Sequence, residues 1–229
     1  VALAAGEAVT LQLDTGGPVA VQVDPATVGV LLENRNLIEA PGGQVLLSAS
    51  AAERLLEGAI PGAGGATGLV VDNGGARLID ITGTINAGRI AIGGGDRDVT
   101  RVAGTLDASQ GILVTGGNVL IDSTAVLDAS GHDGGVVLVG GGERGEDPSV
   151  RNADRVFIAQ GARVAADGER NGGRVIVFSN ESTEIAGQLS ARGGGFIETS
   201  GGWLAIDTVP DAGAGGTWLI DPFNITIQA

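Results

Sequence analysis

Short apolar runs separated by glycine pairs recur along the chain at a nearly constant spacing. The segment from Gly104 to Ser109 returns in altered form from Ala125 to Ser130, so that Leu106 and Leu127 occupy equivalent positions. A Gly-Gly pair and a second apolar run follow each copy. The repeating unit is therefore turn, strand, turn, strand, and Leu106 and Leu127 are predicted to stack in one interior row.

The same unit extends over most of the chain. An apolar residue, a spacer and an alanine recur at Ile38/Ala40, Ile85/Ala87, Leu106/Ala108, Leu127/Ala129, Val164/Ala166 and Leu189/Ala191. The Gly-Gly pairs repeat with a period of roughly 21 residues, interrupted by two longer intervals, and a fixed period in this range is typical of a solenoid. The runs are too short for a helical repeat. We therefore predict an all-β chain that forms a parallel β-helix, with coils about 4.8 Å apart.

The N-terminal part departs from the regular period. Residues 1–47 alternate apolar and polar positions, as expected of half-buried strands. Ser50 and Glu53 then have capping-box spacing, and the alanines and leucines around them favour helix. We predict one short inserted helix near 50–57, which accounts for the first of the two longer intervals. No polar linker interrupts the repeat, so residues 1–229 are predicted to form a single β-helix domain. Because Val1 leads directly into a strand-like pattern, we expect a fragment of a longer protein.

The second longer interval contains a charged, glycine-rich segment at residues 140–148. Glu143, Arg144, Glu146 and Asp147 lie there among four glycines. This polarity predicts a loop that leaves the rod, and loops on rigid scaffolds often carry binding residues. These four residues are the candidate surface-contact site, although a passive excursion is favoured over a contact role.

Composition limits the partners of the chain. Its 42 glycines and 43% hydrophobic residues suit narrow coils with small turns and an aliphatic interior. The net charge of -14 repels phosphate backbones, so no nucleic-acid partner is expected. Without cysteine there is no disulfide framework or thiolate metal site. No apolar run approaches the roughly 18 residues of a membrane span, so the chain is not expected to be membrane-embedded.

The sequence offers few candidates for catalysis. His132 is the only histidine and lies in a glycine turn, where a solvated residue is expected. Asp107, Asp128 and Asp167 recur at the same predicted point of successive coils, and β-helices can carry glycosidase or lyase carboxylates. A residue that recurs at the same place in successive coils is better explained as a turn-forming residue than as a catalytic one. No serine triad or phosphate-binding loop is present in the sequence. We therefore expect no enzyme activity and assign no catalytic, cofactor-binding or metal residue.

One turn has a weak calcium-site character. The segment from Gly93 to Asp98 places two aspartates after three glycines, and carboxylates on a tight loop can offer oxygen ligands. The repeated nonapeptide that builds such sites is absent, and Arg97 supplies a competing cation. A solvated turn is therefore favoured over a calcium site.

The aromatic residues are concentrated at one end of the chain. All six follow residue 156: Phe157, Phe178, Phe196, Trp203, Trp218 and Phe223. They are predicted to fill wider final coils, with Trp203 and Trp218 closing those coils from inside. An aromatic cleft that stacks sugars is the alternative.

The last third of the chain carries a family resemblance. Four segments bear it: Asn171 to Phe178, Leu189 to Gly194, Gly195 to Gly201 (GFIETSG) and Gly216 to Ile227 (GTWLIDPFNITI). Together with Leu32 to Asn34, Gly43 to Ala49 and the helix-like Ala51 to Leu56, they resemble the filamentous haemagglutinin family over nearly the whole chain. The resemblance implies a right-handed β-helix exported by two-partner secretion through an outer-membrane pore. The family's N-terminal secretion signature, with its Asn-Pro-Asn-Gly type turn, does not occur here, so the chain is expected to be the segment that follows it.

The resemblance also implies a function. It points to a structural and adhesive segment of a secreted or surface-bound bacterial exoprotein, active in cell adhesion, contact or biofilm formation. Its implied partners are the outer-membrane secretion pore and a host or bacterial surface receptor. The alternatives are a carbohydrate-active or carbohydrate-binding β-helix and a passive fibre spacer. The lack of aromatic residues before Phe157 disfavours a long sugar-stacking groove there.

Overall fold

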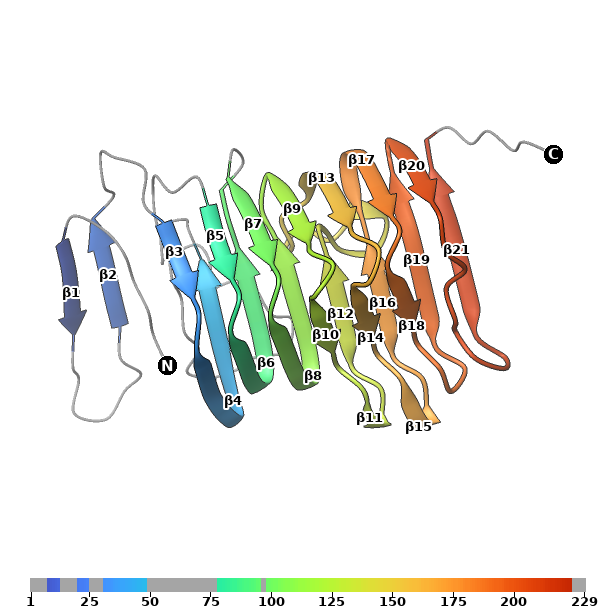
Figure 1. The fold of residues 1–229 in the computed structure, drawn as a ribbon, viewed down its shortest axis with the longest axis horizontal. Coiled ribbons are helices and arrows are strands. Elements are labelled where there is room, and N and C mark those ends of the chain that lie inside the picture. The colour runs from blue at the N-terminus through green and yellow to red at the C-terminus, as the bar shows by residue number, and fades with distance from the viewer. Residues whose placement is uncertain (1–7, 13–19, 25–30, 49–77, 96–97, 224–229) are drawn as a thin grey trace.

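The coiled architecture agrees with the repeat in the sequence. The computed structural model describes residues 8–12, 20–24, 31–48, 78–95 and 98–223. In these ranges short strands wind into coils that stack along one axis, and strands of neighbouring coils pair in parallel (Figure 1). The predicted all-β, parallel β-helix fold is confirmed. The helix predicted near 50–57 lies outside the described residues.

One face of the coils is a seven-stranded parallel sheet. Its strands are β3 (Leu31–Asn34), β5 (Leu78–Ile81), β7 (Val99–Val102), β9 (Asn118–Ile121), β13 (Ala153–Ile158), β17 (Ser179–Ile185) and β20 (Trp203–Ile206). Each strand belongs to a successive coil, so the sheet records the stacking order directly. Alternate residues point into the coil, as the period of two in a strand requires.

A ten-stranded sheet forms the rest of the coil wall. It contains β4 (Leu37–Ser48), β6 (Thr84–Gly93), β8 (Thr105–Thr115), β10 (Val126–Asp128), β12 (Val136–Val139), β14 (Arg163–Ala165), β16 (Arg174–Val177), β18 (Gln188–Ser190), β19 (Phe196–Gly201) and β21 (Thr217–Pro222). The long strand β8 pairs with β10 through its first residues and with β12 through its last residues. The next three coils therefore have two shorter strands (β10 and β12, β14 and β16, β18 and β19) where β4, β6 and β8 have one.

The long strands bend where a glycine allows close contact between coils. The register of β4 and β6 shifts at this bend. A Cβ atom on Gly88 would lie 2.8 Å from the Gly43 carbonyl oxygen of the coil below, so a larger residue does not fit. In later coils the corner is extended by β11 (Gly131–Asp133) and β15 (Gly168–Asn171), which pair with each other.

The core consists of aliphatic rows that run through the stack. Leu106 and Leu127 are direct register partners and neither is exposed to solvent, which confirms the predicted stacking. Their row contains Ile38, Ile85, Leu106, Leu127, Val164 and Leu189, each paired with the next. Burying one such side chain contributes about 1.5–3 kcal/mol. The stack is therefore held mainly by contacts between neighbouring coils.

The strands nearest the N-terminus lie outside this parallel pattern. β1 (Ala8–Gln12) and β2 (Ala20–Asp24) pair with each other in antiparallel register. They form a separate ribbon beside the stack in Figure 1. The alternation in the sequence correctly predicted strands here, although these strands do not continue the parallel ladder.

The prediction that the aromatic residues fill the final coils is wrong for Phe157, Trp203 and Phe223. Trp203 points outward from β20 and is 53% exposed, while Phe157 is 42% and Phe223 83% exposed. Trp218 of β21 does lie in an interior row, as the register partner of Ile197. It is half-buried against the core, and its indole Nε1 donates to Thr199 Oγ1 at 3.0 Å.

Candidate functional site

The predicted contact loop folds back onto the rod. It belongs to the segment between β12 and β13, residues 140–152, which includes the short 3-10 helix η1 (Glu143–Gly145). The backbone N–H of Arg144 donates to Glu198 Oε1 of β19 at 2.8 Å. Asn152 Nδ2 donates to the Gly145 carbonyl oxygen at 2.7 Å and ties the segment to itself. The prediction of a loop that leaves the rod is therefore wrong.

Glycine explains how this loop can lie against the sheet. Gly145 has a φ of 67°, in the left-handed region, and a Cβ atom there would overlap the Phe178 ring. Arg144 has a φ of 54°, which costs a non-glycine residue about 1–2 kcal/mol. The polar residues of the segment predicted that its side chains face solvent. They did not predict that the backbone N–H of Arg144 bonds to the rod.

A buried carboxylate of β19 holds the loop. The Glu198 side chain projects from the outer side of the sheet beside Ile176, yet it is fully buried. Its Oε1 accepts from the Arg144 N–H and from the Ser200 hydroxyl, the latter at 2.6 Å. Its Oε2 is buried and has no hydrogen-bond partner among the described residues. Only one of the two carboxyl oxygens of Glu198 is therefore hydrogen-bonded within the described residues.

The electrostatic surroundings of Glu198 favour its neutral form. Burial raises the pKa of Glu198 most, and the negative charges of Glu143 and Asp221 act in the same direction. The hydrogen bonds from Ser200 and from the Arg144 backbone act in the opposite direction and are outweighed.

Ion pairs surround the docked loop. Arg174 Nη2 donates to Glu143 Oε2 at 2.5 Å, which joins the loop to β16. The Arg174 guanidinium also lies over the Phe196 ring, 4.5 Å from its centroid. Arg144 Nε is 3.9 Å from Asp221 Oδ2 of β21. The loop therefore contacts three consecutive coils.

A groove with a volume of about 310 Å³ lies between this loop and the sheet. Its apolar lining comes from Leu113, Val136, Leu138 and Ile176, and its polar lining includes Arg89, Gln110, Glu143, Asp147 and Arg174. Arg89 Nε of β6 donates to Gln110 Oε1 of β8 at 2.9 Å, which joins two neighbouring coils. An apolar floor with charged walls can recognise a ligand by shape and charge.

The four predicted contact residues have different positions. Glu143 and Asp147 line the groove, and Arg144 contributes its backbone N–H to the Glu198 contact. Glu146 is exposed at the end of η1. Sequence reasoning missed Glu198, because a glutamate at an outward position of a strand is normally solvated and gives no signal of burial. The role of these residues as a contact surface remains a prediction.

The three repeated aspartates do not form one row. Asp107 and Asp128 are register partners, but the partner of Asp128 in the next coil is Ala165. Asp167 instead accepts hydrogen bonds from the backbone and guanidinium of Arg192. Burial acts to raise the pKa of Asp167, but these hydrogen bonds outweigh it and the pKa is lowered.

Two further candidates from the sequence are turn residues. His132 is exposed, with Nδ1 3.3 Å from Glu169 Oε2. Asp98 Oδ2 accepts from the Gly95 N–H at 2.8 Å and so closes the glycine turn. In the ranges that the structure describes, no group of three or more His, Cys, Asp or Glu side chains is arranged to hold a metal ion.

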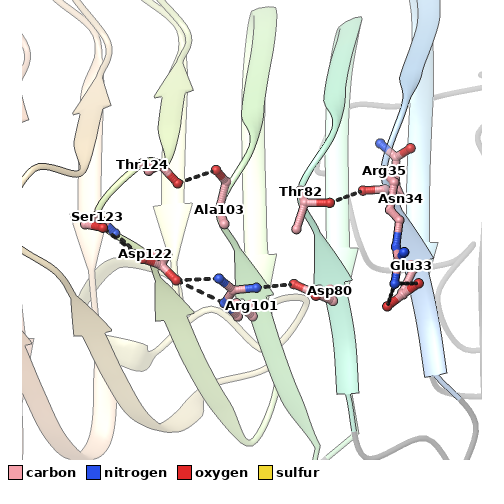
Figure 2. Close-up of polar contacts among 10 residues, drawn as sticks. All are labelled: Glu33, Asn34, Arg35, Asp80, Thr82, Arg101, Ala103, Asp122, Ser123 and Thr124. Carbon is pink, nitrogen blue, oxygen red and sulfur yellow. Dashed lines mark hydrogen bonds and ion pairs between the residues drawn. The ribbon is translucent and has the colours of Figure 1, made fainter.

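A second polar cluster lies on the outer side of the seven-stranded sheet (Figure 2). Arg101 lies between Asp80, its register partner in the preceding coil, and Asp122, which follows β9 in the next coil, two residues after Leu120, the register partner of Arg101 there. Its Nη1 donates to Asp80 Oδ1 at 2.9 Å, and its Nη2 donates to Asp122 Oδ2 at 2.6 Å. Hydrogen bonding to Arg101 lowers the pKa of Asp122. The cluster links three coils and acts as a structural ladder.

Comparisons with known proteins place the fold. No family model and no curated protein sequence matches the chain. Among solved structures it is similar to the crystal structure of the HMW1 secretion domain from Haemophilus influenzae, with 23% identity and a TM-score of 0.54. The likeness covers 83% of this chain and 60% of that one. At this identity the two share a fold. Within the described ranges, no helix has the length and apolar character to cross a membrane.

Proposed function

We propose that the chain is a structural and adhesive segment of a secreted bacterial surface exoprotein that leaves the cell by two-partner secretion. The observation that carries the proposal is the stack of parallel coils, in which each coil is joined residue by residue to its neighbours. The structural likeness to a secretion domain supports the same assignment.

The architecture suits export in an unfolded form. Because each coil pairs only with adjacent coils, stability accrues by neighbour contacts as the chain emerges. No cysteine is present to form a disulfide before translocation. The proposed export partner is an outer-membrane pore, which would pass the chain before its coils assemble.

Cell fractionation tests the export step. In the native bacterium, an antibody against the chain should detect it in the medium or at the cell surface. Deleting the partner pore should retain it inside the outer membrane, while a periplasmic marker protein stays unchanged. Retention of the chain inside cells that have an intact pore would contradict the proposal.

The adhesive role is assigned to the groove beside the 140–152 loop. Beads coated with the purified chain should bind host or bacterial cells, and Val136→Asp should reduce binding because Val136 is a partly exposed part of the groove lining. Leu37→Asp is the matched control, since Leu37 is also exposed but is not part of that lining. If the wild-type beads bind nothing, the passive spacer is favoured.

A carbohydrate-binding β-helix is the second candidate. Trp203 and Phe157 are both exposed on the outer side of the seven-stranded sheet, where aromatic rings could stack on sugars. Glycan binding that is lost in Trp203→Ala and kept in Val136→Asp would favour this candidate over the groove.

A further inference from the structure

The contact between Glu198 and the 140–152 loop depends on a carboxyl group that is only half hydrogen-bonded. Glu198 Oε1 accepts from the Arg144 N–H of the loop and from the Ser200 hydroxyl of its own strand. Glu198 Oε2 is buried without a partner among the described residues. The loop is therefore attached to a carboxyl group that is fully buried.

The charged groups that face Glu198 leave it without a cation. From the loop, Glu143 is paired with Arg174 of β16, and the Arg144 guanidinium is directed toward Asp221 of β21. The two charged side chains that act on the pKa of Glu198, Glu143 and Asp221, are both acidic and both raise it. An ionised Glu198 would thus be a buried charge compensated by two hydrogen bonds alone, and such burial is costly.

We propose that Glu198 is a proton-operated latch, which keeps the 140–152 loop docked on β16 and β19 while its carboxyl is protonated and releases the loop on ionisation. Opening allows water to reach Oε2 and so removes the cost of burying the charge. It would also uncover Ile176, which is buried, and Phe178, which is half-buried. The latch thereby controls access to an apolar surface.

The direction of the pH effect follows from linkage. The pKa of Glu198 is raised in the docked state by burial, whereas in the open state it returns to the ordinary value of an exposed glutamate. Docking is fully favoured below that ordinary pKa, and it weakens as pH rises toward the raised docked-state pKa. Within that window the ratio of docked to open loop falls by about tenfold for each pH unit.

Hydrogen exchange followed by mass spectrometry tests the latch. Protection of residues 142–150, corrected for the intrinsic pH dependence of exchange, should fall by at least about tenfold between pH 4 and 8. Glu198→Gln keeps a neutral side chain with an acceptor oxygen, so its protection should not vary with pH. Glu184→Gln removes an exposed carboxylate from β17 and is the control, expected to keep the wild-type profile.

Asp221→Asn provides an independent measurement. It removes a negative charge that raises the pKa of Glu198, so the fall in protection should move to lower pH. This variant decides the matter if Glu198→Gln does not fold, as judged by exchange in the row around Leu106. An unchanged profile in Asp221→Asn, a pH-independent wild type, or an equal fall in Glu198→Gln would overturn the latch.

Discussion

The two tryptophans offer a matched test of how the last coils are held together. Trp218 lies in an interior row of β21, whereas Trp203 projects outward from β20. Replacing each by alanine removes the same set of side-chain atoms from neighbouring parts of the C-terminal end of the stack. A difference between the variants therefore measures the effect of position.

The magnitudes follow from burial and hydrogen bonding. Replacing a fully buried tryptophan by alanine lowers the free energy of unfolding by about 3–5 kcal/mol. Because Trp218 is half-buried, Trp218→Ala should lower it by about 2 kcal/mol. Removing its hydrogen bond to Thr199, which is fully buried, adds about 1 kcal/mol. Trp203 is 53% exposed and should lose under about 1 kcal/mol.

Hydrogen exchange and urea unfolding can separate local from global effects. In Trp218→Ala, exchange should accelerate in residues 196–223 while the strands around Leu106 remain protected, because coils depend mainly on their neighbours. Each variant keeps one tryptophan, so its fluorescence reports on the remaining position. Trp203→Ala should leave the exchange rates of residues 196–223 and the free energy of unfolding in urea close to those of the wild type.

Two outcomes would refute this reasoning. Equal losses in the two variants would show that the interior position of Trp218 does not matter. A uniform loss of protection along the whole rod would show that the coils unfold as a single cooperative unit rather than from the end.

Three further predictions concern other parts of the rod. Leu127→Ala should lower the free energy of unfolding by about 2–5 kcal/mol in urea titrations, because Leu127 is fully buried in the aliphatic row. Arg101→Gln should cost under about 1 kcal/mol at neutral pH, since the ladder is partly exposed. Because hydrogen bonding to Arg101 lowers the pKa of Asp122, this difference should disappear as pH falls through that lowered pKa. Gly145→Ala should accelerate exchange in the 140–152 loop by tenfold or more, because a methyl group there overlaps Phe178.

Each of these predictions has a contrary result. A Leu127→Ala loss below about 1 kcal/mol would mean that the row can collapse around the cavity. A stability difference for Arg101→Gln that persists in strong acid would exclude the ion pairs as its cause. Unchanged exchange in Gly145→Ala would show that the loop does not lie against Phe178.

The interior rows could be predicted from the sequence, whereas the outer surface could not. Leu106 and Leu127 stack because a constant repeat with matching turns has one natural register. Trp203 was misplaced because successive strand residues face opposite sides, so an offset of one residue exchanges inside and outside. Asp167 lies outside the aspartate row because it follows Val164 by three residues, whereas Asp128 follows Leu127, the register partner of Val164, by one.

The docking of the 140–152 loop could not be predicted from the loop sequence, because its main contact lies in a distant part of the chain. The glycines at 140–142 and 145 indicated a segment free to adopt unusual backbone angles. Its anchor, Glu198, belongs to β19, several strands after Arg144 in the chain. Neither segment alone predicts the contact, because it combines a backbone donor with a carboxylate that is buried only after the loop has folded.

The register between coils also sets the step by which such a protein can change length during evolution. β6 and β8 match along their whole length apart from the shift at the bend, and β5 and β7 match residue by residue. Excising residues 84–104 would join Gly83 to Thr105, and would bring Leu106 against Ile38 and Val119 against Ile79. These rows would remain aliphatic and in phase, and the rod would be shorter by one spacing of about 4.8 Å. Loss of a single residue would instead displace every later side chain from its row, so whole coils are the natural unit of duplication and loss.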